Sequence, residues 1–169
     1  MSTTGYILSA ALILVVVRQL RGRRLAGFTL YLPLGIAAYV ASKYLHTIPT
    51  HGNDLALEIA GIAVGLSLGI ASGIATLVYP DHDGVPYARA TWIAASLWVV
   101  GIGARLGFSL YAQHGGGATI ARFSSAHALT MQAWVAGLIL MAIAEVGSRT
   151  TVLIVRSRRM APAAIIPAS

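Results

Sequence analysis

Three ionisable residues lie inside apolar stretches, where a charge facing lipid is costly: Glu58, Arg105 and Glu145. Glu58 follows Asp54 by four residues, so the two carboxyl groups share one face of a helix. Two carboxyl groups in one site can hold a proton between them, which is the chemistry of a general acid. We predict that Glu58 forms an ion pair with Arg105, which leaves Asp54 as the acid.

Aromatic and polar residues that could bind a ligand accompany these charges. Trp98 precedes Arg105 by seven residues and Phe108 follows it by three, so all three share a helix face. We expect an outward-facing polar pocket around Asp54, Glu58 and Arg105. Its further ligand-binding candidates are Lys43, Tyr39, Trp98, Phe108, His127 and Trp134. The alternative is that such residues merely mark the headgroup zone, where His, Tyr and Lys are ordinary.

For Glu145 we predict an ion pair within its own helix. Arg149 follows it by four residues, in the order that favours an ion pair on a helix. We place this pair at the membrane interface, near the end of the last span.

Composition predicts the environment of these residues. The chain has 169 residues, of which 57% are hydrophobic and only 10% are charged, against roughly 25% charged in soluble domains. So few charges cannot cover a water-facing surface, which indicates a membrane protein. The chain contains no cysteine, which excludes disulfides, thiolate chemistry and iron–sulfur clusters.

Apolar runs long enough to cross a bilayer need roughly 20 residues. The runs are continuous rather than alternating, so we predict helices and no strands. We therefore expect an all-α membrane bundle of five helices. The predicted spans are Thr3–Leu20, Leu25–Leu45, Leu55–Tyr79, Ala88–Ala112 and Ala126–Val146. A shorter apolar run, Thr151–Val155, is expected to prolong the last helix or to lie at the surface.

Arginines predict the orientation, because basic residues concentrate in cytoplasmic loops. We predict that the N-terminus lies outside and the C-terminus in the cytoplasm, because this orientation places most arginines in cytoplasmic segments. These arginines are Arg18, Arg21, Arg23, Arg24, Arg89, Arg149, Arg156, Arg158 and Arg159, against Lys43 and Arg122 on the outer side. We expect one transmembrane domain over residues 1–149 and a short basic cytoplasmic tail over 150–169.

Glycines in the third predicted span recur every four residues, at Gly61, Gly65, Gly69 and Gly73. Helices in lipid associate through close backbone packing, so this glycine zipper predicts the face that touches a neighbouring helix. We favour a neighbour within the same chain over a second copy.

Two functions are compatible with these features. The first is a non-enzymatic accessory membrane protein that binds a lipophilic or anionic ligand in the outer pocket. The second is a membrane-bound acid-initiated enzyme on a prenyl lipid, of the terpene cyclase or isomerase type. In that case a buried acid protonates an alkene and aromatic rings stabilise the cation. We expect no cofactor, no metal and no nucleic acid; the expected partners are the bilayer, a prenyl-type small molecule and another membrane protein.

One segment carries a resemblance to a known family. An apolar run closed by arginines resembles the actinobacterial members of the CcdC-like family, small multi-spanning membrane proteins linked to cytochrome c biogenesis. The segment is Val15-Val16-Val17-Arg18-Gln19-Leu20-Arg21. The resemblance implies an accessory protein of the bacterial plasma membrane and transfers no catalytic residue. The absence of cysteine argues against a direct part in thiol–disulfide exchange.

Overall fold

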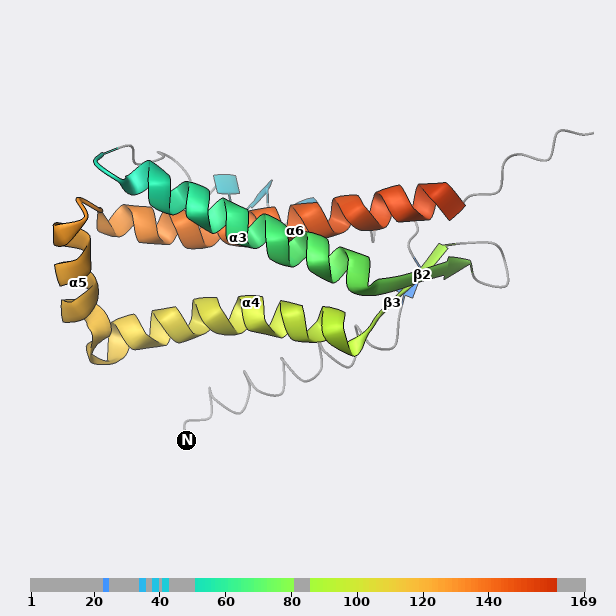
Figure 1. The fold of residues 1–169 in the computed structure, drawn as a ribbon, viewed down its shortest axis with the longest axis horizontal. Helices are drawn as coiled ribbons and strands as arrows, with labels where there is room; N and C mark the ends of the chain where they lie inside the picture. The colour runs from blue at the N-terminus through green and yellow to red at the C-terminus, as the bar shows by residue number, and fades with distance from the viewer. Residues whose placement is uncertain are drawn as a thin grey trace, which may run out of the picture.

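Three long helices dominate the computed structural model, which describes residues 23–24, 34–35, 38–39, 41–42, 51–80 and 86–160. They are α3 (Asp54–Ala75), α4 (Trp92–Tyr111) and α6 (Met131–Met160) (Figure 1). Each is long and apolar enough to cross a membrane. The described part of the chain is therefore mostly helical, and its three long apolar helices indicate a multi-pass membrane protein, in agreement with the composition.

These helices correspond to the third, fourth and fifth predicted spans. The first predicted span and most of the second lie outside the described residues. Within the second, residues 34–35, 38–39 and 41–42 are helical. The prediction of five spans is thus confirmed for three of them.

A small antiparallel sheet corrects the expectation of helices alone. It consists of β1 (Arg23–Arg24), β2 (Thr76–Pro80) and β3 (Pro86–Ala90), in the order β1-β3-β2. The predicted third span therefore ends four residues early, and the fourth begins four residues late. Thr, Val and Tyr favour the extended backbone, and paired prolines at the ends of β2 and β3 prevent a helix from continuing there.

The last helix is longer than predicted. α6 runs over 30 residues and includes Thr151–Val155, which confirms that this apolar run prolongs the helix. At 1.5 Å per residue α6 is about 45 Å long, whereas the 22 residues of α3 span about 33 Å. A hydrocarbon layer is roughly 30 Å thick, so α3 matches it and α6 extends beyond it.

The glycine zipper packs α3 against α6 along its whole length. A Cβ atom added to Gly61 would lie 2.7 Å from the Gly137 carbonyl oxygen. One added to Gly65 would overlap the Met141 carbonyl, and one added to Gly69 the Glu145 carbonyl. The residue numbers of the facing positions rise together along α3 and α6, so the two helices run parallel. Their backbones lie closer than side chains at these glycine positions would allow. The predicted helix-contact face is confirmed, and its neighbour is α6 of the same chain.

Both ends of α3 are also tied to α6. At the beginning, Asp54 accepts a hydrogen bond of 2.7 Å from the backbone N–H of Thr130, 76 residues later. At the other end, Arg156 Nη1 donates to the carbonyl oxygens of Gly73, Ile74 and Thr76. A cation at a helix C-terminus satisfies carbonyls that lack partners within the helix and complements the helix dipole.

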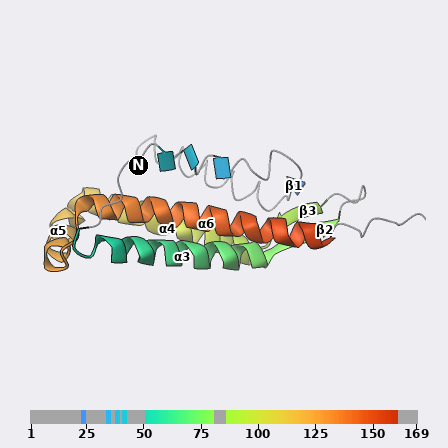
Figure 2. The same cartoon turned by 90° about the horizontal axis from the view of Figure 1, so that it is seen from above.

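α4 is connected to the other helices at each of its two ends. Thr91 caps its first turn, accepting from the Ala94 N–H, and donates to the Ala75 carbonyl at 2.7 Å. At its other end a π-helical turn, η1 (Ala112–Gly116), contains a kink where Gly115 has a φ of 101°. The short helix α5 (Gly117–Ala126) then lies across the end of the bundle and leads to α6. Seen from above, α4 lies behind α3 and α6, and in the first view it lies to one side of them, so the three long helices do not form a single layer (Figures 1 and 2).

The glycine contact makes a direct prediction. Gly65→Ala should lower the free energy of unfolding by about 1–3 kcal/mol, because the added methyl group overlaps the Met141 carbonyl. Gly107→Ala on α4 is the matched control, since a Cβ there meets nothing within 4 Å, and it should leave stability unchanged or raise it slightly. Thermal unfolding in lipid nanodiscs measures both. Equal melting temperatures for the two variants would contradict this account of the helix contact.

Candidate functional site

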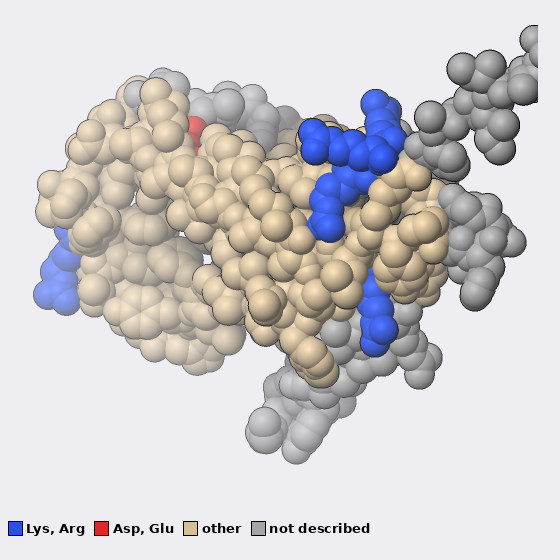
Figure 3. Space-filling view, turned by 45° about the vertical axis from the view of Figure 1, so that its right-hand side comes forward, with Lys and Arg blue, Asp and Glu red and all other residues tan. Residues whose placement is uncertain are grey.

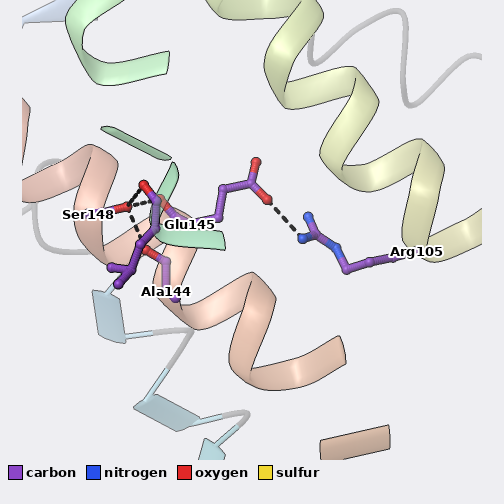
Figure 4. A network of polar contacts seen from close by, with 5 residues as sticks. Arg105, Ala144, Glu145 and Ser148 are labelled. Atoms are coloured by element: carbon purple, nitrogen blue, oxygen red, sulfur yellow. Dashed lines mark hydrogen bonds and ion pairs between the residues drawn. The ribbon is translucent and has the colours of Figure 1, made fainter. Parts of the chain in front are cut away.

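An ion pair inside the bundle joins α4 to α6. Arg105 Nη1 donates to Glu145 Oε2 at 2.8 Å, and the two side chains are 19% and 4% exposed. Figure 4 shows the two side chains meeting between their helices. The carboxyl group also lies against Gly101 on α4, where a Cβ would come within 2.7 Å of Oε2. The pair thus joins two helices at a level where glycine leaves room for the carboxylate.

This arrangement corrects the predicted pairing of Glu58 with Arg105. Gly69 faces the Glu145 carbonyl, and eleven residues separate Gly69 from Glu58, or roughly 16 Å along the helix. Helical side chains lean toward the helix N-terminus. Since α4 begins at the sheet, Arg105 leans toward Gly101 and away from the end that holds Glu58. The prediction compared only how deep Glu58 and Arg105 lie in their own helices, and it therefore chose Glu58 instead of Glu145 as the partner of Arg105.

Glu145 is deeper than predicted. The predicted last span ended at Val146, so Glu145 was expected at the membrane interface. It is in fact the fifteenth of the 30 residues of α6 and is 3% exposed. Its carboxylate reaches Arg105, and the length of α6 is the signal that identifies Glu145 as a residue of the bundle interior.

Asp54 is fully occupied by structural contacts. Its Oδ1 accepts from the Thr130 N–H and its Oδ2 accepts from the Thr130 hydroxyl at 2.8 Å. Thr130 in turn accepts from the Ala133 N–H at 3.2 Å, which caps the first turn of α6. Asp54 is completely buried. These bonds give Asp54 a role in fixing the beginning of α3 to the beginning of α6.

Glu58 is the acid of the described residues whose side chain has neither a hydrogen bond nor an ion pair; Glu145 also has a buried oxygen without a partner, Oε1, but its Oε2 binds Arg105. Glu58 is 2% exposed, and its Oε1 has no hydrogen-bond partner among the described residues. It lies one turn after Asp54 and next to the close contact of α3 with Gly137. A buried carboxyl oxygen without a donor is costly, and such groups in native proteins often mark a place where a ligand binds.

Aromatic side chains gather where α4, α5 and α6 meet. Phe108 and Trp134 stack with ring centroids 5.0 Å apart, and Phe123 lies 6.1 Å from Trp134. Trp134 Nε1 donates to the Ser124 hydroxyl at 3.0 Å. His127, which ends α5, stacks on Phe123 at 4.1 Å. The structure therefore brings three of the predicted binding residues together and adds Phe123, which the sequence analysis missed.

The remaining predicted residues are dispersed. Tyr39 is 63% exposed on a helical piece of the second predicted span. Trp98 is half-buried on α4, two turns before Arg105. Lys43 lies outside the described residues, as does the segment that carries the CcdC-like resemblance. Ile120 and Ser124 are the buried residues of α5 and lie four positions apart, a helical spacing that could have indicated α5 in the sequence.

Comparisons of the chain with protein-family models, curated proteins and solved structures give no match.

The ion pair can be tested with a double-mutant cycle. Arg105→Met and Glu145→Met should each lower the free energy of unfolding by about 2–4 kcal/mol, because each leaves a buried charge unpaired. The double variant should lose clearly less than the two single losses combined. Unfolding in nanodiscs supplies the four measurements. Purely additive losses would show that the two side chains do not interact.

The structural role of Asp54 makes a separate prediction. Asp54→Asn keeps one acceptor for Thr130 and replaces the other by a donor, so we expect a loss of about 1–2 kcal/mol in stability. Thr130→Val should cost a similar amount and should not add fully to it. An Asp54→Asn variant as stable as the original protein would remove the basis for this role.

Proposed function

We propose that the protein is a non-enzymatic accessory membrane protein that binds a lipophilic ligand at the α5 end of the bundle. Glu58 holds the polar end of the ligand, and the aromatic cluster of Phe108, Phe123 and Trp134 packs against its apolar part. The observation that carries the proposal is the buried Glu58 carboxyl oxygen without a donor among the described residues. A hydroxyl or ammonium group on the ligand would supply that donor.

The register of the helices supports a single site. Asp54 faces Thr130, and Gly61 faces Gly137, at a constant separation of 76 residues. Glu58 is therefore level with Trp134, the residue at the centre of the aromatic cluster. Sites for lipophilic ligands commonly combine aromatic walls with a few polar groups that fix orientation.

Electrostatics favour a neutral or cationic polar end over an anionic one. Arg105 is the cation that the sequence predicts at the pocket, but its charge is balanced by Glu145 at 2.8 Å. Glu58, the group left without a partner, is an acid and repels an anion. We therefore favour a prenyl-type alcohol or amine over a diphosphate.

The second candidate is an acid-initiated enzyme on a prenyl lipid, and the same carboxyl group favours it. Glu58 would have to act alone, because both Asp54 oxygens are occupied by Thr130. The aromatic rings of Phe108 and Trp134 could stabilise a carbocation. We nevertheless favour an accessory role in the bacterial plasma membrane, with a membrane-protein partner. The reason is that Asp54, the predicted acid, is occupied by Thr130.

Trp134 provides a test of ligand binding. In a Trp92→Phe/Trp98→Phe background it is the one tryptophan left of the three in the chain. Farnesol and geranylgeraniol, added to the protein in nanodiscs, should change Trp134 fluorescence with a saturable midpoint. Farnesyl diphosphate should bind at least tenfold more weakly. Glu58→Leu should weaken alcohol binding by about tenfold or more, because it removes a hydrogen bond to a charged or polar acceptor.

Ser67→Leu is the matched control, since it places the same side chain on an exposed position of α3. It should bind the alcohols like the parent protein. Absence of saturation with either alcohol, or equal binding by the Glu58→Leu variant, would overturn the proposed site. Conversion of an added prenyl compound to a new product that requires Glu58, detected by mass spectrometry, would replace the accessory role by the enzymatic one.

A further inference from the structure

The sheet end of the molecule carries a rigid extension of α6. Gly73, near the end of α3, faces Val152 and Arg149 of α6, so the last residues of α6 pass beyond α3. Nine residues, from Val152 to Met160, extend by roughly 14 Å at 1.5 Å per residue. The headgroup layer on each side of a bilayer begins where the hydrocarbon ends. The extension therefore lies at headgroup depth.

The sheet and Arg156 hold this extension in place. Leu153 forms a buried cluster with Val78 of β2 and Ala88 of β3. Arg156 donates to three carbonyl oxygens at the end of α3. The last turns of α6 are thus fixed relative to the bundle, and their surface is presented in one orientation.

Among the described residues, the charged side chains exposed at this end are basic. Arg89, Arg158 and Arg159 are all exposed, and Figure 3 shows most of the visible basic side chains near the sheet. β1 places positions 23 and 24 beside β3, at the same end. Among the described residues the acids are Asp54, Glu58 and Glu145, all buried and all within the spans. Nothing in the described part of the chain neutralises Arg158 and Arg159.

Apolar and aromatic groups lie beside these charges. Val155 is 44% and Met160 is 39% exposed on the same extension. On the sheet, Tyr79 is 40% exposed and pairs with Tyr87, with ring centroids 5.4 Å apart. Tyrosine is enriched at the membrane–water interface. A partner for this surface must offer negative charge next to apolar chains.

We propose that the sheet end is a binding surface for anionic phospholipids, with Arg158 and Arg159 holding the lipid phosphates. An acidic soluble protein would satisfy the arginines but not the adjacent apolar groups at headgroup depth. Arginine binds phosphate through a planar pair of N–H donors. The positive end also identifies this side as cytoplasmic, where anionic lipids attract basic segments.

The test compares lipid selectivity in the full chain. The protein is reconstituted in nanodiscs that contain phosphatidylcholine with a minor fraction of phosphatidylglycerol, and lipids retained by the protein are measured by native mass spectrometry. We expect the retained lipid to be enriched in phosphatidylglycerol at 0.1 M NaCl and less so at 1 M, because salt screens exposed charges. Arg158→Gln/Arg159→Gln should reduce the enrichment by about fivefold to twenty-fivefold, because each basic residue near an anionic surface contributes up to roughly fivefold.

Arg122→Gln is the matched control, because Arg122 is an exposed arginine on α5 at the opposite end. It should retain the enrichment, and melting temperatures should confirm that all variants are folded. Equal retention of the two lipids by the original protein, or enrichment unaffected by the double substitution, would overturn the proposal. Tighter binding of an acidic peptide than of phosphatidylglycerol, lost in the double variant, would also overturn it and assign the surface to a protein partner.

Discussion

The close parallel contact between α3 and α6 is the constraint on which the other features depend. Lipid gives apolar helices little reason to associate, so the contact must come from backbones that approach closely. The glycines from Gly61 to Gly73 allow this approach, and each faces a backbone or side-chain atom of α6. Because the glycines recur every four residues, the contact continues along α3, and the register that it adopts determines which polar groups become neighbours.

Polar residues in this bundle mostly serve to secure its helices. Asp54 fixes the beginning of α6 through Thr130, Arg156 closes the end of α3, and Arg105 with Glu145 links α4 to α6. Each of these contacts satisfies groups that lipid could not. Glu58 is the exception, since no described residue bonds to its carboxyl group, whereas Glu145, whose Oε1 also lacks a donor, binds Arg105 through Oε2. That exception, rather than the number of charges within the spans, is the reason to place a ligand site at Glu58.

The two ends of the bundle are built for different surroundings. At one end α5 crosses the bundle and brings Phe123 to Phe108 and Trp134. At the other, the sheet supports an α6 extension rich in arginine. α4 is the helix that connects both regions, and within the bundle it is held by the Arg105–Glu145 pair instead of a continuous glycine contact. The proposed lipophilic site and the proposed anionic-lipid surface therefore lie at opposite ends of the bundle.

The amino-acid sequence alone was enough to predict the membrane environment, the three described spans and the glycine face of α3. These follow from composition and helical periodicity, which act locally along the chain. Tertiary structure decided the partner of Arg105, the depth of Glu145 and the sheet that interrupts the predicted spans. Spacing gives the depth of a residue in its own helix, but it does not give the neighbouring helix or its register. Arg105 bonds Glu145 because α4 runs antiparallel to α6, so that each side chain leans along its own helix toward the other.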